Sequence, residues 1–142
     1  MKNLWLTRLL ATAGTILLGL PVISPIVFAF VSLVRGNGFL LDYLMPGELF
    51  IMVLVGAGLI IWAAVLAKTL LKPILWVLGV SLVLFFGCQG LAQVTGLANG
   101  KLPASGPVFI IVMVMLILYD LGVVALTLIG GMVIKKAFST EK

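Results

Sequence analysis

Four long apolar runs limit what this chain can fold into more than any other feature of its sequence. In the 142 residues they cover about 9–34, 47–71, 74–95 and 107–134, and short segments rich in Gly, Pro and charged residues separate them. A helix of about 20 apolar residues is long enough to cross the hydrocarbon core of a bilayer. The sequence therefore predicts an all-α fold, a four-transmembrane-helix bundle formed by one integral membrane domain over residues 1–142.

The composition indicates that most of the surface faces lipid. The chain is 63% hydrophobic and 9% charged, whereas soluble domains are about 45–50% apolar and about 25% charged. The net charge is +5, but the basic residues are dispersed and form no stripe beside stacking aromatics, which argues against a nucleic-acid partner. We expect the lipid bilayer as partner, with the basic residues acting as topology signals and attracting anionic headgroups.

The first apolar run has two interpretations. It follows Lys2 and Arg8, so a cleaved signal peptide fits its start. We favour an uncleaved membrane helix, because the apolar residues continue as far as Val34. Pro21 and Pro25 remove backbone donors from this helix and predict a kink there.

The basic residues predict the orientation. With the N-terminus inside, the outer side holds only Arg35 and Lys101. The inner side then holds Lys2, Arg8, Lys68, Lys72, Lys135, Lys136 and Lys142. This bias predicts that both termini of the multi-pass chain are cytoplasmic. The membrane is expected to be the cytoplasmic membrane of a bacterium or archaeon. A short amphipathic stretch in the first outer loop, 39–45, is expected to lie in the interface with Tyr43 at headgroup depth.

Asp120 is the residue that most suggests a function. It lies near the middle of the fourth run, where a carboxylate costs about 2.5–3.5 kcal/mol on insertion scales. The sequence predicts an intramembrane polar seam between the third and fourth helices, made of Asp120, Gln89, Gln93, Thr127, Ser81 and Cys88. Counted from the flanking lysines, Gln89 and Asp120 differ in height by about 3 Å, so we expect Gln89 to face Asp120. Cys88 is interpreted as a small apolar filler.

Small residues are expected to mark the helix-packing faces. Gly56, Ala63 and Ala67 share one face of the second helix, and Gly131 is assigned to the packing face of the fourth. Small faces let helix backbones approach closely, either within one chain or in a homo-oligomer.

The chemical inventory favours a protein that is not an enzyme. The chain has no histidine and a single cysteine, so no metal site and no cofactor site is predicted. The favoured function is a structural or accessory subunit that binds lipid, itself or a larger membrane protein. The alternative is a small proton- or cation-linked channel or transporter that uses Asp120. An enzyme acting on lipid headgroups through Asp42 and Glu48 ranks third.

Overall fold

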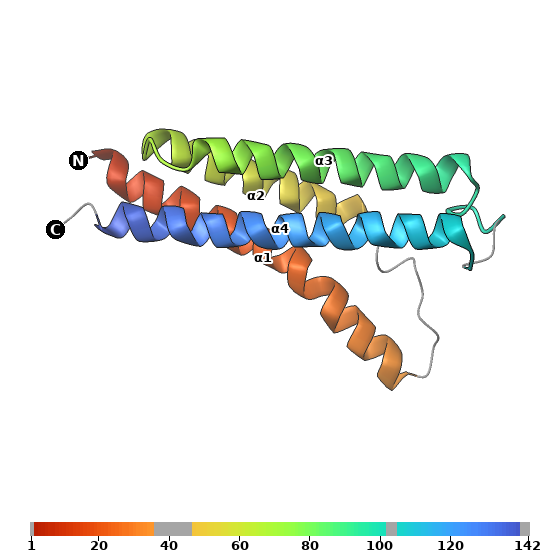
Figure 1. Cartoon of the computed structure of the whole chain (residues 1–142). Helices are drawn as coiled ribbons and strands as arrows, with labels where there is room; N and C mark the ends of the chain where they lie inside the picture. The colour runs from red at the N-terminus through yellow and green to blue at the C-terminus, as the bar shows by residue number, and fades with distance from the viewer. Residues whose placement is uncertain (1, 36–46, 102–104, 140–142) are drawn as a thin grey trace.

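The structure is a computed structural model that describes residues 2–35, 47–101 and 105–139. Its four helices are α1 (Lys2–Val34), α2 (Gly47–Leu66), α3 (Leu71–Val94) and α4 (Pro107–Ser139) (Figure 1). Each is long and apolar enough to cross a membrane, so the prediction of an all-α bundle of four membrane-spanning helices is confirmed. The expected interfacial stretch 39–45, with Asp42 and Tyr43, lies outside the described residues.

The first and last helices, α1 and α4, are longer than the apolar runs that predicted them. α1 and α4 contain 33 residues each, which corresponds to about 50 Å of helix against a hydrocarbon core of about 30 Å. Lys135 and Lys136 lie inside α4 and do not end it, because lysine is a good helix former. α4 therefore continues beyond these lysines as far as Ser139.

The helices pair in an order that differs from their order along the chain. α1 packs along both α2 and α4, and α3 packs along α4, whereas α2 touches α3 much less. Both termini and the α2–α3 turn lie at the same end of the molecule (Figure 1). We call this the basic end, because Arg8, Lys68, Lys72, Lys135 and Lys136 belong to it.

One pair of glycines, Gly14 and Gly56, sets how closely α1 approaches α2. A Cβ built on Gly14 would lie 2.8 Å from the carbonyl oxygen of Gly56, and one built on Gly56 would lie 3.0 Å from that of Gly14. The two backbones therefore touch directly at this crossing, and any side chain would hold them apart. Such small-residue contacts are the usual way in which membrane helices pack.

Aromatic side chains link α2 to α3, whose backbones are further apart, and α3 to α4. Phe50 of α2 stacks on Phe85 of α3, with ring centroids 4.0 Å apart and planes 4° apart. Phe85 also contacts Tyr119 of α4, with centroids 5.1 Å apart. Large rings thus fill the space between α2 and α3 that backbone contact does not close.

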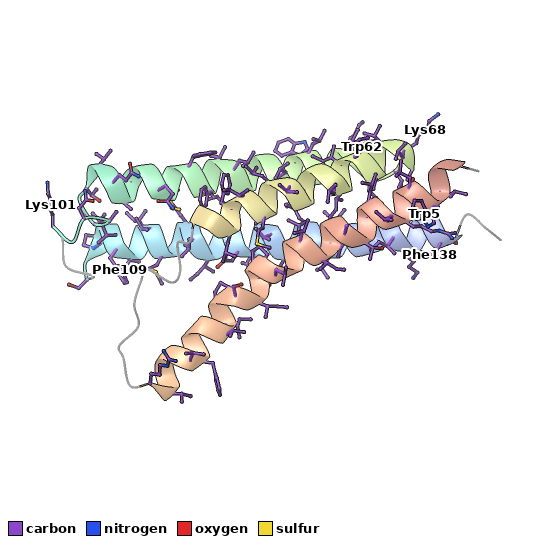
Figure 2. All side chains as sticks on the ribbon, turned by 180° about the vertical axis from the view of Figure 1, so that it is seen from behind. Trp5, Trp62, Lys68, Lys101, Phe109 and Phe138 are labelled. Carbon is purple, nitrogen blue, oxygen red and sulfur yellow. The ribbon has the colours of Figure 1, made fainter. Side chains whose placement is uncertain are left out.

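The second half of α1 leaves the bundle. Pro21 is its last described side chain that is buried, and beyond it Ile26, Phe30 and Val34 are exposed. Figures 1 and 2 both show α1 changing direction near its middle and diverging from α4. We call residues 22–34 the distal arm, and the space between this arm and α4 the fork.

Candidate functional site

The structure separates the predicted polar seam into buried and exposed members. On α3, Ser81 and Cys88 are buried, Gln89 is half-buried and Gln93 is exposed. Ser81 lies directly against Gly122 of α4, where an added Cβ would collide with its hydroxyl. The buried stripe of α3 therefore faces α4 as expected, but the glutamines lie at its edge.

The small polar groups of the seam do not join the helices. Ser81 donates to the carbonyl of Val77 (2.8 Å) and Thr127 to that of Val123 (2.9 Å). Each hydroxyl thus donates its hydrogen bond to a carbonyl of its own helix, four residues earlier in the chain. This is a common arrangement in helices. The Cys88 thiol likewise donates to a carbonyl within α3. The seam is therefore a packed surface and not a hydrogen-bonded network.

The register of α3 against α4 corrects the predicted match in height between Gln89 and Asp120. Ser81 opposes Gly122 in this antiparallel pair, so Gln89, eight residues further along α3, lies near the height of residue 114 of α4. That is about six residues, or about 9 Å, from Asp120. Counting from lysines failed because Lys72 lies about 6 Å deeper than Lys135 in this register. A long lysine side chain can extend to the interface from that depth.

Asp120 points away from α3. Side chains two positions apart on a helix point in directions that differ by about 200°. Asp120 is two positions before Gly122, the residue of α4 that meets Ser81 of α3. The half-buried Asp120 side chain therefore lies on the opposite side of α4. Within residues 2–35, 47–101 and 105–139, its carboxyl has no hydrogen-bond or ion-pair partner.

The register of α1 against α4 places Asp120 at the fork. Arg8 donates to the carbonyl of Ala137, and Thr15 lies against Gly130. The same register, continued along both helices, puts Asp120 at the height of residue 25 of α1. This is just beyond the last buried residue of α1, where the distal arm departs.

α2 does not extend along the distal arm into the fork. Because Gly14 of α1 opposes Gly56 of α2, the first residue of α2, Gly47, lies at about the height of residue 23 of α1. α2 therefore begins close to the height of Asp120 and runs toward the basic end. Among the described helices, α3 packs along α4 much more extensively than α2 does.

The predicted packing residues occupy different environments. Gly56 and Ala63 are buried against neighbouring helices, and Ala67 lies half-buried beside a pocket at the basic end. Gly131 is exposed, and a Cβ there would meet nothing within 4 Å. The packing glycine of α4 is the preceding residue, Gly130, which lies against Thr15 and Ile60. The face shifts by one residue because α4 packs on both α1 and α3.

Hydrogen bonds between helices occur at the basic end. The Arg8 guanidinium donates to the Ala137 carbonyl through Nε (3.4 Å) and a terminal nitrogen (3.3 Å), and it lies 4.2 Å from the ring centroid of Phe138. Lys136 Nζ donates to Thr69 Oγ1 over 3.0 Å. These contacts tie α1 and the α2–α3 turn to the end of α4.

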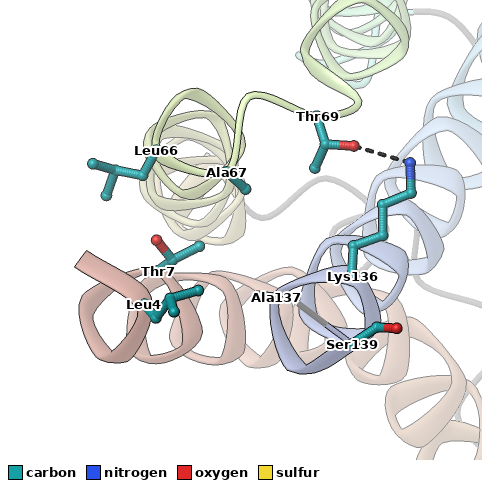
Figure 3. A pocket seen from close by; sticks show the side chains of 8 residues that line it. All are labelled: Leu4, Thr7, Leu66, Ala67, Thr69, Lys136, Ala137 and Ser139. Atoms are coloured by element: carbon teal, nitrogen blue, oxygen red, sulfur yellow. Dashed lines mark hydrogen bonds between the residues drawn. The ribbon is translucent and has the colours of Figure 1, made fainter. Parts of the chain in front are cut away.

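A pocket of about 480 Å³ opens beside these contacts (Figure 3). Its lining consists of Leu4, Thr7, Leu66, Ala67, Thr69, Lys136, Ala137 and Ser139. Three hydroxyl side chains and one ammonium group thus share the pocket with apolar side chains. The sequence alone did not suggest this site, because its residues come from three separate segments.

Three tryptophans gather near the basic end, and their positions were a clue in the sequence. Trp5, Trp62 and Trp76 are 70%, 59% and 75% exposed, and Figure 2 shows Trp5, Trp62 and Lys68 toward the same end. Tryptophan is enriched at the boundary between hydrocarbon and headgroups. Trp5 and Trp62 thus lie toward the end of the bundle where a membrane interface would favour them.

No group of His, Cys, Asp and Glu side chains in the described ranges is arranged to hold a metal ion. A scan against protein-family models found no match, and comparison with curated proteins and with solved structures found none either. The fork, Asp120 and the basic end are the features of the structure that bear on function.

Proposed function

We propose that this chain is an accessory membrane subunit that binds a helix of another membrane protein at the fork. The observation that carries the proposal is the half-buried carboxyl of Asp120, which faces the fork and has no hydrogen-bond partner in the part of the chain that the structure describes. Such a group inside a membrane is costly unless a donor satisfies it. A partner helix that brings a Lys, Arg, Asn or Gln side chain to this height would supply the donor.

A second copy of the chain fits the fork less well than a different protein. Copies inserted with the same topology have equivalent residues at equal heights. The two glutamines of α3, Gln89 and Gln93, lie about 9 Å or more from the height of Asp120. Ser24, near the right height, already donates to the carbonyl of Leu20 (2.8 Å). The donor is therefore assigned to a protein of different sequence.

The distal arm provides the apolar part of the same surface. Its exposed residues include Ile26, Val27, Phe30, Val31 and Val34. Apolar side chains of α4 such as Ile117 are exposed as well, and a partner helix could pack against both sets. The arrangement places one polar contact within an apolar interface, as expected for specific association of membrane helices.

The orientation follows from the charge bias and belongs to the same proposal. The basic end, with both termini, is assigned to the cytoplasm. The chain is a multi-pass protein of the cytoplasmic membrane of a bacterium or archaeon. The fork then opens toward the outer half of the bilayer. No catalytic step and no cofactor form part of this function.

The test is photo-crosslinking in cells that express the chain at its native level. A photoreactive amino acid replaces Ile117, which is 52% exposed and one turn from Asp120, or Val83 on the far face of α3, which is 72% exposed and near the same height. We expect position 117 to yield one protein adduct and position 83 to yield none. The adduct should be lost in Asp120→Leu and kept in Asp120→Asn, which still accepts a hydrogen bond.

The isolated chain supplies the control for folding. Because Asp120 has no partner within the described residues, Asp120→Leu should leave the stability of the purified chain unchanged or raise it by about 1–3 kcal/mol. If Asp120 instead locks two helices of this chain together, Asp120→Leu will lower that stability. An adduct with the mass of two copies of this 15.1 kDa chain would also refute the proposal.

The alternative of a proton- or cation-linked transporter rests on the same carboxyl. It predicts flux through liposomes that contain only this chain, and loss of that flux in Asp120→Asn. The accessory function predicts no flux above that of empty liposomes, since the described intramembrane hydroxyls of α3 and α4 turn back on their own helices and line no continuous polar path.

A further inference from the structure

We propose that the pocket at the basic end binds the phosphate group of an anionic phospholipid, with Lys136, Thr69 and Thr7 as its polar contacts. The pocket lies between the first turns of α1, the α2–α3 turn and the last turns of α4 (Figure 3). Its volume of about 480 Å³ falls within the range of about 300–1,000 Å³ that is typical of ligand sites. This site is separate from the fork and does not depend on the partner proposed there.

The described charged side chains around the pocket are all basic. The described residues of this end include Arg8, Lys68, Lys72, Lys135 and Lys136 and no carboxylate. Two helices begin here and two end here, so their dipoles, each about half a charge at a terminus, cancel. The side chains therefore decide the sign, and basic pockets between membrane helices favour anionic headgroups.

The lining suits a phosphate that carries an apolar body. Lys136 Nζ and Thr69 Oγ1 are 3.0 Å apart, so both can contact one phosphate oxygen or two neighbouring ones. Thr7 is 2% exposed and adds a hydroxyl on the wall opposite the end of α4. Leu4, Leu66 and Ala67 complete the wall. A free phosphate would leave this apolar wall uncovered, whereas the glycerol and the start of an acyl chain would cover it.

The exposed tryptophans place the pocket at headgroup depth. Trp62 precedes Leu66 of the pocket wall by one helical turn, which is about 6 Å. Trp5 directly follows Leu4, another wall residue. Because tryptophan prefers the boundary between hydrocarbon and headgroups, the pocket lies at the level where lipid phosphates are found.

The α2–α3 turn is held in a strained shape that positions Thr69. Lys68 and Leu70, on either side of Thr69, have φ of 49° and 57°. These values lie in the left-handed region, which residues with a side chain occupy at a cost of about 1–2 kcal/mol. Lys136 contacts the threonine between them. A bound phosphate bridging Thr69 and Lys136 would stabilise the turn in this shape.

The test measures lipid retention by the purified full-length chain with native mass spectrometry and thermal unfolding. Phosphatidylglycerol and phosphatidylcholine, which share acyl chains, are added to micelles separately. We expect phosphatidylglycerol to be retained and to raise the unfolding temperature, and phosphatidylcholine to do neither. Lys136→Gln should weaken phosphatidylglycerol binding about fivefold, the equivalent of about 1 kcal/mol for one basic residue near a headgroup.

Matched variants separate the pocket from general charge attraction. Lys135→Gln removes the same charge one residue away, outside the pocket lining, and Lys101→Gln removes it at the other end. Both should change binding less than twofold, and Lys136→Arg should retain it. Thr7→Val, which changes no charge, should weaken binding as well.

Three results would overturn the assignment to an anionic lipid. The first is equal retention of phosphatidylcholine and phosphatidylglycerol. The second is an equal loss of binding in Lys135→Gln and Lys136→Gln. The third is a rise in unfolding temperature with inorganic phosphate alone that matches the rise with phosphatidylglycerol, since that would make free phosphate the ligand.

Discussion

Replacing Gly14 by alanine should destabilise the bundle, although alanine is the better helix former. The new Cβ would lie 2.7 Å from Cγ1 of Ile60 and 2.8 Å from the carbonyl oxygen of Gly56. Ordinary contact begins at 3.4 Å, so α1 and α2 would have to separate by about 0.6 Å. The carbonyl oxygen belongs to the backbone and cannot rotate out of the way.

The magnitude follows from two opposing terms. Alanine in place of glycine in a helix gains about 1 kcal/mol. Overpacking costs about 1–3 kcal/mol, and a radial gap of about 0.5–1 Å forfeits a quarter to a half of each dispersion contact along the interface. Since dispersion is a main attraction between helices in lipid, we expect a net loss of about 1–2 kcal/mol for Gly14→Ala.

Gly58→Ala is the matched control, since a Cβ on Gly58 meets nothing within 4 Å. It should stabilise the chain by about 0.5–1 kcal/mol. Equilibrium unfolding in mixed micelles, followed by the fluorescence of Trp5, Trp62 and Trp76, measures both variants. Equal stability of Gly14→Ala and Gly58→Ala would refute the close crossing of α1 and α2.

Two further changes test other contacts of the structure. Gly122→Ala should lower stability by about 1–3 kcal/mol because its Cβ would collide with the Ser81 hydroxyl, and adding Ser81→Ala should restore most of the loss in a double-mutant cycle; additive effects would count against this contact. Lys68→Gly should raise the unfolding temperature, because glycine adopts the φ of 49° without a Cβ clash; no rise would mean that the turn is unstrained.

Some features of the site could be predicted from particular residues, and others could not. The small residues Gly56 and Ala63 predicted a close helix contact, and both are buried. Ser81 and Cys88 predicted the buried face of α3, where both lie. Gly14 was overlooked because a single glycine in an apolar run does not reveal what it faces. The match between Gln89 and Asp120 failed because heights counted from lysines assume that each lysine lies at the same depth, which long side chains make unnecessary.

The sequence by itself determined that the chain forms four membrane-spanning helices, because a backbone in hydrocarbon must satisfy its hydrogen bonds internally and about 20 apolar residues are enough to cross. Only the tertiary structure decided which helices touch. Contacts between helices in lipid depend on shape and register, and apolar patterning is nearly uniform around each helix. The register of α1 and α3 against α4 therefore turned Asp120 away from Gln89 and toward the fork, and it gathered Thr7, Thr69 and Lys136 around one pocket.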